Sequence, residues 1–218
     1  MWQEWVSALV DWLYPPRCPV CKKEVHVHGQ WCRPCFSEVS CVREINVVLG
    51  KLNYLKGAQT ICHYREGVRK LMQRLKFQGR RRYATHLRWL IQQAQDELWV
   101  AAPDVLVVPV PLHPKRQQER GYNQVERIFQ PWVEEKKLEW CDVLLRVRPT
   151  EPQWDLDKEQ RRSNLKDAFA VSRPDLVAGR RILLVDDILT TGVTINECAK
   201  VLRRAGAESV YALTVASR

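Results

Sequence analysis

The stretch of sequence that decides the fold is Ile182-Leu183-Leu184-Val185-Asp186-Asp187-Ile188-Leu189-Thr190-Thr191-Gly192-Val193-Thr194. It begins with an apolar run that is typical of a buried strand. Two adjacent carboxylates follow, and a hydroxyl-rich turn with one glycine then opens a helix. In open α/β sheets, ligands bind beyond the carboxyl ends of the strands. The stretch therefore predicts a strand, a loop and a helix, with a ligand site at the loop.

The residue types in this loop suit a ribose 5-phosphate. A phosphate placed after Thr190 would meet main-chain N–H groups and the positive end of the helix dipole. Gly192 lets the backbone approach closely, and the threonine hydroxyls add donors. Asp186 and Asp187 would repel a phosphate in direct contact, but they can accept hydrogen bonds from ribose hydroxyls. An ordinary polar turn is the alternative, although it requires neither paired acids nor this threonine–glycine spacing.

The rest of the chain alternates between strand and helix patterns. Strands are expected within 54–64, 105–110, 143–147, 168–171 and 210–215, and helices within 2–13, 68–75, 87–98, 121–137 and 194–204. This alternation predicts an α/β domain with a mainly parallel sheet. The polar stretch 148–166 shows little periodicity and is expected to form a mobile loop. We expect two units, residues 1–50 with a short helix and a cysteine-rich module, and residues 51–218 with the α/β domain.

A second dense motif follows the apolar run Val105 to Val110. It comprises Val107-Val108-Pro109-Val110-Pro111-Leu112-His113-Pro114-Lys115-Arg116 and Arg120-Gly121-Tyr122-Asn123-Gln124. Because it also follows a strand, it should lie at the same edge of the sheet as the loop Thr190 to Thr194, the threonine loop. Its basic residues Lys115, Arg116 and Arg120 would bring positive charge to that edge.

Two cysteine pairs predict a structural zinc site. Cys18 and Cys21 form one pair, and Cys32 and Cys35 form the second pair after ten intervening residues. Four thiolates close a tetrahedral zinc shell, and the ion would stabilise a segment too short to bury its own core. The remaining candidates are Cys41, His26 and His28, which could replace a ligand, and Cys62, Cys141 and Cys198, which are expected to be buried thiols.

Composition places limits on the class of protein. Of the 218 residues, 45% are apolar, which is enough for one buried core. The 35 basic and 25 acidic side chains give a net charge of +10, which favours polyanionic partners. The longest apolar run is too short for a transmembrane helix, and Glu4 and Asp11 argue against an export signal. We therefore expect a cytoplasmic protein without membrane insertion.

The stretch Ile182 to Thr194 resembles the phosphoribosyl-pyrophosphate fingerprint of type I phosphoribosyltransferases along its whole length. That resemblance implies that Asp186 and Asp187 hold the ribose hydroxyls. It also implies that the 5-phosphate is bound by Thr190, Thr191, Gly192, Val193 and Thr194.

With the second motif and with Thr150 and Asn164, the chain resembles the ComF-type competence protein family, most closely its ComFC-like members. The resemblance covers nearly the whole chain. It implies a Rossmann-like type I phosphoribosyltransferase domain with a parallel sheet, preceded by a small zinc ribbon. Related proteins often carry two ribbons, and only one set of four cysteines is kept here. The implied pyrophosphate-binding residues are Pro111, Leu112, His113, Lys115, Arg116 and Arg120, and those of a flexible catalytic loop are Gln153, Arg161 and Arg162, of which the two arginines could equally form a solvated basic surface.

Three functions stay open. The first, implied by the family, is a competence factor that handles incoming single-stranded DNA in natural transformation. It would bind phosphoribosyl pyrophosphate with Mg²⁺, and a competence helicase or other DNA-processing proteins would be further partners. The second is a phosphoribosyltransferase of nucleotide salvage that acts on a small base or amine, and the third is a non-catalytic module that binds DNA or protein. The second motif and the ribbon favour the first, while no residue identifies an acceptor.

Overall fold

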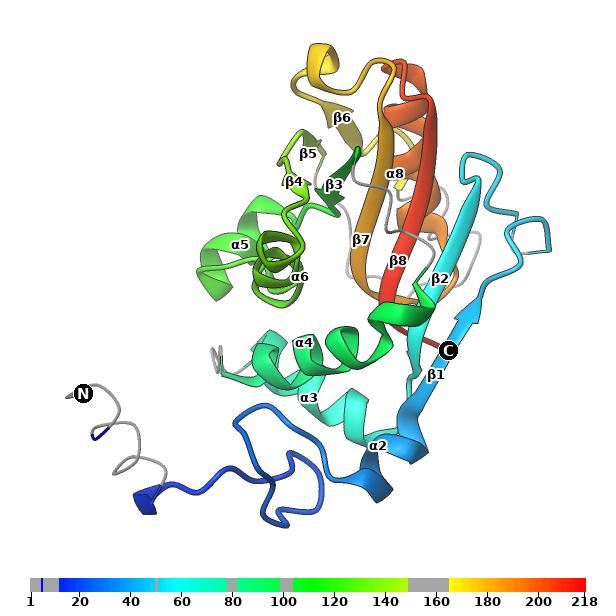
Figure 1. The fold of residues 1–218 in the computed structure, drawn as a ribbon. Coiled ribbons are helices and arrows are strands. Elements are labelled where there is room, and N and C mark those ends of the chain that lie inside the picture. Colours follow the sequence, from blue (N-terminus) through cyan, green and yellow to red (C-terminus); the bar gives the residue numbers. More distant parts are fainter. Residues whose placement is uncertain (1–4, 6–11, 50, 78–81, 99–103, 149–164) are drawn as a thin grey trace.

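A six-stranded sheet forms the centre of the molecule (Figure 1). The computed structural model describes residues 5, 12–49, 51–77, 82–98, 104–148 and 165–218. The strand order is β1-β2-β8-β7-β3-β4, and all neighbours are parallel except β1, which is antiparallel to β2. The bounds are β1 (Ser40–Glu44), β2 (Gly57–His63), β3 (Val105–Pro109), β4 (Glu139–Trp140), β7 (Arg181–Leu189) and β8 (Ser209–Ser217). The predicted α/β fold with a mainly parallel sheet is confirmed.

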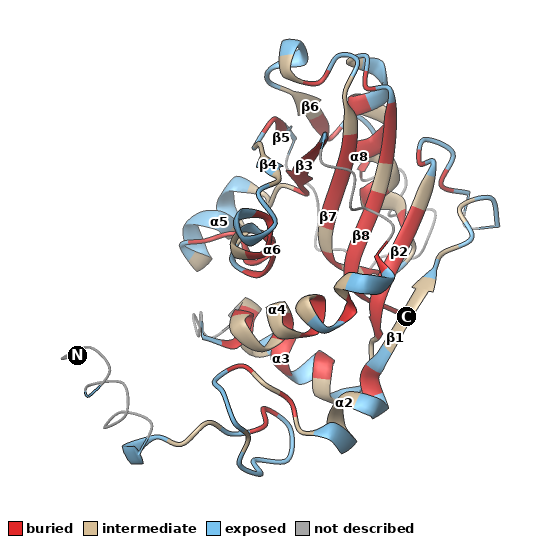
Figure 2. Cartoon of the chain, viewed as in Figure 1, coloured by how far each residue is buried: buried red, intermediate tan, exposed pale blue. Residues whose placement is uncertain are grey.

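Helices cover both faces of this sheet. On one face lie α3 (Glu66–Phe77), α4 (Tyr83–Ala94) and α6 (Gln124–Glu135), and on the other lies α8 (Val193–Arg204). Side chains alternate along a strand, so β7 sends Leu183 and Val185 into the first core and Ile182 and Leu184 into the second. Burial on both faces explains the continuous apolar runs of the central strands (Figure 2). No helix in the described part of the chain combines the length and apolarity needed to cross a membrane.

Three local features differ from the sequence predictions. The strand expected to end at Val185 continues to Leu189, so both carboxylates lie on β7 itself. A separate short helix, α5 (Pro114–Arg120), precedes α6, because Gly121 ends it with φ +71° and Asn123 then caps α6 by accepting from Val125 N–H. The strands predicted at 143–147 and 168–171 form a two-stranded antiparallel sheet outside the main one, made of β5 (Leu144–Arg146) and β6 (Phe169–Val171).

The cysteine-rich module packs against α3 and α4 at the lower end of the molecule in Figure 1. Trp31 is only 1% exposed, and its indole N–H donates to the carbonyl of His86 at 3.0 Å. On α3, a Cβ built at Gly67 would lie 2.9 Å from Val20 and 3.3 Å from Trp31. The module and the two helices therefore share one core.

From the module the chain enters α2 (Arg33–Val39) and then β1, the edge strand of the main sheet. The predicted division between residues 1–50 and 51–218 stays a prediction. Two short 3-10 turns complete the described elements, η1 (Gln95–Glu97) and η3 (Pro174–Leu176). The expected helix 2–13 lies largely outside the described residues, as does most of the expected loop at 148–166.

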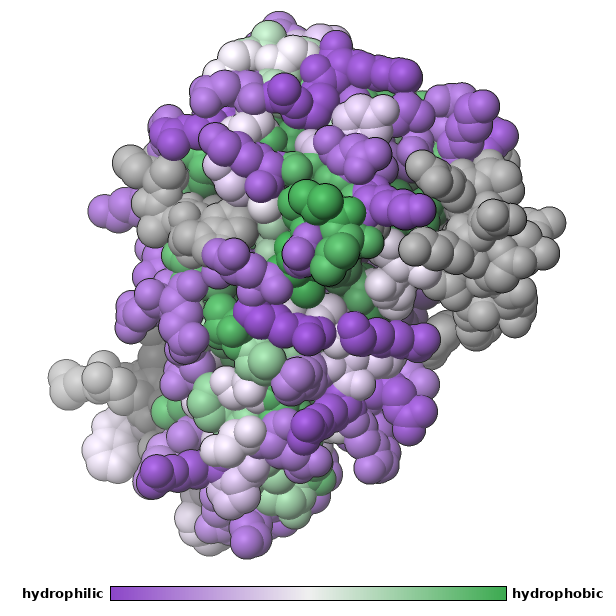
Figure 3. Space-filling view, turned by 90° about the vertical axis from the view of Figure 1, so that its right-hand side faces the viewer, coloured by the Kyte–Doolittle hydropathy of each residue, from purple (hydrophilic) through white to green (hydrophobic). Residues whose placement is uncertain are grey.

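The connection between β1 and β2, residues 45–56, packs one of its sides against the start of α8. Leu52 is buried beside Gly192, and the Tyr54 N–H donates to the side-chain oxygen of Asn196 at 3.4 Å. On its other side Val48 and Leu49 are 79% and 81% exposed. The face of the molecule beside β1 and β2 is mainly hydrophilic and carries an apolar area near its centre (Figure 3).

Candidate functional site

The strands β3 and β7 are neighbours whose chains leave toward opposite faces of the sheet. After β3 the chain runs through α6, on the face of α3 and α4, to reach β4. After β7 it runs through α8, on the other face, to reach β8. At such a reversal, ligands of α/β proteins bind beyond the carboxyl ends of the two strands, and we call this region the crevice. The two predicted motifs follow these two strands.

The crevice begins where β3 ends. The β3–β7 pairing runs to Pro109 and Val185, and the Val110 N–H donates to the Val185 carbonyl at 3.0 Å. The second motif then turns away into α5, whereas β7 continues beside β8 to Leu189. The two carboxylates follow Val185 directly, so they lie at the point where β3 and β7 part.

Asp187 faces the α3 and α6 side and is held by groups from both helices. Only 5% of this residue is exposed. The Lys76 ammonium group of α3 lies 2.6 Å from Asp187 Oδ2, and the Gln124 amide of α6 donates to the same oxygen at 3.1 Å. Arg120 donates in turn to Gln124 Oε1 at 3.0 Å. Asp187 is thus a fixed carboxylate with a cation beside it.

Asp186 points toward the opposite face of the sheet from Asp187, because successive side chains alternate along a strand. Its Oδ1 accepts from the Asp187 N–H at 2.8 Å. Burial and the charge of Asp187 raise the pKa of the Asp186 carboxyl. The charge of Asp186 acts on Cys198 of α8 and on Arg146 of β5. Asp186 thus lies near Cys198 and Arg146 as well as near Asp187 and Lys76, an asymmetry that the sequence prediction of one equivalent pair did not include.

The threonine loop opens α8 with a backbone turn that only glycine adopts readily. Gly192 has φ +73° and is the N-cap of the helix, and its carbonyl accepts from Asn196 N–H at 2.9 Å. A Cβ at this position would lie 2.4 Å from Leu52 Cδ2. Thr190 is exposed, and Thr191, Val193 and Thr194 are half-buried. The helix start is thus built as the sequence predicted, while the phosphate-binding roles stay predictions.

Basic side chains surround the crevice on the side of the second motif. Burial lowers the pKa of His113, and the charges of Arg146, Arg116 and Lys115 lower it further. Burial lowers the pKa of Arg120 as well, with Arg116 acting in the same direction and Asp187 against it. Pro111 and Leu112 are half-buried in the connection to α5. Arg116 and Lys115 therefore lie within electrostatic reach of His113, and Arg120 lies within electrostatic reach of both Arg116 and Asp187.

The sequence analysis did not predict two cationic side chains that lie near the acids. Lys76 reaches Asp187 from the last turn of α3, and Arg146 comes from β5, where its guanidinium lies 5.6 Å from the centre of the Phe169 ring. Both come from segments assigned by their apolar pattern alone, so only a strand order would have shown their proximity. Gln153, Arg161 and Arg162, predicted for a flexible loop, lie outside the described residues.

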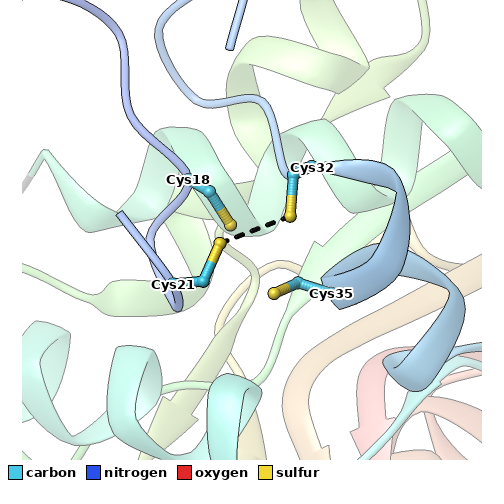
Figure 4. A group of neighbouring side chains, drawn as sticks. All are labelled: Cys18, Cys21, Cys32 and Cys35. Carbon is cyan, nitrogen blue, oxygen red and sulfur yellow. Dashed lines mark hydrogen bonds between the residues drawn. The ribbon is translucent and has the colours of Figure 1, made fainter. Parts of the chain in front are cut away.

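The four predicted cysteines converge on one point (Figure 4). The sulfur atoms of Cys18, Cys21, Cys32 and Cys35 all lie within 4.8 Å of one another, and those of Cys21 and Cys32 are 3.4 Å apart. Zinc–sulfur bonds of about 2.3 Å in a tetrahedron place sulfurs roughly 3.8 Å apart, so the cluster fits a zinc ion.

The thiols of this cluster already differ in acidity. Burial raises the pKa of Cys18, but hydrogen bonds from backbone N–H groups, with that of Cys32 the strongest, outweigh it and bring the pKa down to about 7. Burial and the neighbouring sulfurs raise the pKa of Cys35. The described residues hold no other group of three or more candidate metal ligands.

The other cysteines and the aromatic residues of the module have packing roles. Cys62 and Cys198 are buried as predicted, whereas Cys141 is only half-buried. Trp31 belongs to the shared core, and Phe36 packs edge-on against Trp89 with ring centres 5.2 Å apart. Both rings therefore pack within the molecule.

A cavity of about 590 Å³ lies elsewhere, at the amino-terminal edge of the sheet. Its lining includes Lys56, Val105, Arg181 and Tyr211, from the beginnings of four strands or the residues before them. None of the residues predicted for the ribose-phosphate site lines it. This cavity is therefore separate from the two predicted motifs, which follow the carboxyl ends of β3 and β7 at the opposite edge of the sheet.

Comparisons with known protein families find one match for the cysteine-rich module and one for the α/β domain. A double zinc ribbon domain model matches residues 9–62, and a phosphoribosyl transferase domain model matches residues 146–218. The second match covers β7 and α8, whereas β2 and β3 of the same sheet lie outside it.

Relatives match over much more of the chain. Competence protein F of Haemophilus influenzae is 34% identical over 204 residues, which cover 89% of this chain and 82% of that protein. DNA utilization protein YhgH of Escherichia coli K12 is 32% identical over 203 residues, 88% of this chain and 86% of that protein. Competence protein ComFC of Streptococcus pneumoniae is 31% identical over 156 residues, 70% of this chain and 64% of that protein. The chain therefore belongs to the ComF-type family of competence and DNA-utilization proteins.

Proposed function

We propose that the crevice between β3 and β7 binds phosphoribosyl pyrophosphate, and that the protein uses this site in handling single-stranded DNA during natural transformation. The observation that carries the proposal is the convergence of three groups at one switch point of the sheet. They are the acid pair on β7, the glycine turn that opens α8, and the basic residues after β3. Each group suits one part of the ligand, namely ribose, 5-phosphate and pyrophosphate.

The charges support this assignment of the three parts. The first turn of α8 offers main-chain N–H groups and a positive dipole end to the 5-phosphate. Arg116 and Arg120 offer a positive field to the pyrophosphate, and Asp187 offers a fixed acceptor to a ribose hydroxyl. Because Asp187 Oδ2 is already engaged by Lys76 and Gln124, a magnesium ion would be held chiefly by oxygens of the ligand.

We further propose that the four cysteines bind a structural zinc ion. A shell of four thiolates has no open position, so the ion would stabilise the module and take no part in chemistry. The shared core with α3 and α4 makes the ribbon part of the scaffold that carries Lys76. The DNA role rests on the names of the relatives and on the net charge of +10, which favours a polyanionic partner.

Calorimetric titration with phosphoribosyl pyrophosphate and Mg²⁺ tests the ligand. The wild-type protein should bind, and the double variant Asp186→Asn, Asp187→Asn should lose binding at least tenfold. The double variant Asp96→Asn, Asp175→Asn is the matched control, since it makes the same two replacements at exposed surface positions. Folded wild-type protein that does not bind would overturn the proposal, as would equal losses in the two double variants.

A further inference from the structure

Lys76 forms a largely buried ion pair with Asp187, one of the two acids at the crevice. It is the penultimate residue of α3, and its ammonium group lies 2.6 Å from Asp187 Oδ2. The side chains of Lys76 and Asp187 are 23% and 7% exposed, so water screens this pair only weakly. A second lysine of the same helix, Lys70, pairs with Glu66 at the same distance, but there both side chains are more than half exposed. Pairs of that kind contribute little.

The contacts that Asp187 makes with α3 and α6 use one and the same carboxylate oxygen. Lys76 from α3 and Gln124 from α6 both use Oδ2. The backbone N–H of Asp187 is fixed as well, because it donates to Asp186 Oδ1. The carboxylate is therefore held in one rotation by groups on two helices.

The charges around Asp187 show why a cation is needed here. Asp186 is its direct neighbour, and two adjacent carboxylates repel each other in a buried place. Lys76 from α3 and, further away, Arg120 from α5 offset this repulsion. A neutral side chain at position 76 would leave Asp187 with the Gln124 amide and the more distant arginine.

We propose that Lys76 is a positioning residue that fixes the Asp187 carboxylate through Oδ2 and so leaves Oδ1 to accept from a sugar hydroxyl. This inference rests on the proposed function, since it assigns Asp187 to the ribose of the ligand. Lys76 acts through the carboxylate and touches neither phosphate group. Its effect therefore belongs to the ribose part of the ligand, and it should be equal for ligands with and without a pyrophosphate.

Affinity measurements with three probes test this role in Lys76→Met, Lys76→Arg and the control Lys70→Met. The probes are phosphoribosyl pyrophosphate with Mg²⁺, ribose 5-phosphate and inorganic phosphate. We expect Lys76→Met to weaken the first two equally, by about tenfold, and to leave inorganic phosphate unchanged. The affinities of Lys76→Arg should stay within about threefold of those of the wild type. The affinities of the control Lys70→Met should equal those of the wild type. Should Lys76→Met not fold, Lys76→Gln removes the charge while keeping a polar side chain, and the same pattern is expected.

The alternatives give different patterns. A loss confined to phosphoribosyl pyrophosphate would mean that Lys76 attracts the pyrophosphate, and this would overturn the inference. Equal losses for all three probes would indicate general damage, and unchanged affinities would show that the ion pair plays no part in binding; both overturn it as well. If the wild-type protein binds no phosphoribosyl pyrophosphate, it is the proposed function that fails.

Discussion

At Gly192 the backbone conformation disfavours any side chain, and a Cβ would also force the buried Leu52 side chain to shift. The Gly192 φ of +73° is strained for any other residue, and a Cβ would lie 2.4 Å from Leu52. Gly179 has nearly the same φ, +72°, but a Cβ there would meet nothing within 4 Å. The two glycines therefore separate the cost of backbone strain from the cost of the clash.

We expect Gly192→Ala to lower the free energy of unfolding by about 2–4 kcal/mol, because strain and overpacking add. Gly179→Ala should cost only the strain, about 1–2 kcal/mol. Urea denaturation of the two variants measures the difference. Equal losses of stability would contradict the close packing of the residue 45–56 connection on the threonine loop.

Replacing the two acids by asparagine should change the stability of the protein in opposite directions. Burial and Asp187 raise the pKa of Asp186, so the folded protein retains a proton on this group at pH values where the unfolded chain releases it. The corresponding stability is present at low pH and declines as pH rises above the ordinary aspartate pKa toward the raised value. Asp186→Asn removes this decline and should raise the melting temperature at pH 8.

Asp187→Asn should instead destabilise the protein by roughly 1–3 kcal/mol, because Lys76 loses its carboxylate partner. Melting temperatures measured at pH 6 and pH 8 for both variants check this contrast. A stabilising Asp187→Asn, or an Asp186→Asn that melts below the wild type at pH 8, would contradict the different surroundings described for the two acids.

The helix α3 connects the ribbon to the crevice. Its first turn carries Gly67 against Val20 and Trp31, and its last turn carries Lys76 against Asp187. Between these ends Val68, Leu71, Met72 and Leu75 bury one face in the core. Apolar spacing in the sequence predicted this helix, but it gave no sign of which elements its two ends would touch.

Loss of the metal should therefore weaken α3 as well as the ribbon. We expect Cys21→Ser to lower the melting temperature and to speed amide hydrogen exchange in α3, because the ribbon shares its core with that helix. Cys141→Ser is the control, since Cys141 is also a partly accessible thiol but lies outside the cluster. Unchanged exchange in α3 alongside a disordered ribbon would contradict this coupling.

The sequence was informative where a feature depends on neighbours along the chain. The β7–α8 unit and the four-cysteine cluster follow from local spacing, since a strand, a turn and a helix, or two cysteine pairs, are short-range patterns. The partners of Asp186 and Asp187 do not, because Lys76, Gln124 and Arg146 meet the acids only after β3, β7 and β8 pair. The extension of β7 past its acids likewise depends on pairing with β8.

The whole molecule is basic, so its proposed binding to single-stranded DNA should weaken as the salt concentration rises. Exposed Lys23 and Arg33 of the ribbon region are the candidates to test first, because Trp31 and Phe36 are committed to packing. Affinity for a fluorescent single strand should fall steeply between about 50 and 200 mM salt. Lys23→Ala with Arg33→Ala should weaken binding and flatten the salt dependence, while Lys136→Ala with Arg173→Ala is the matched control. Salt-independent binding, or equal effects of the two pairs, would contradict a ribbon-centred contact.

A crystal structure of the protein grown with phosphoribosyl pyrophosphate and Mg²⁺ tests whether the ligand binds where β3 and β7 part. We expect the 5-phosphate at the start of α8, within hydrogen-bonding distance of the main chain around Gly192, and the ribose beside Asp186 and Asp187. Ligand density in the cavity lined by Lys56 and Arg181, at the opposite edge of the sheet, would contradict it.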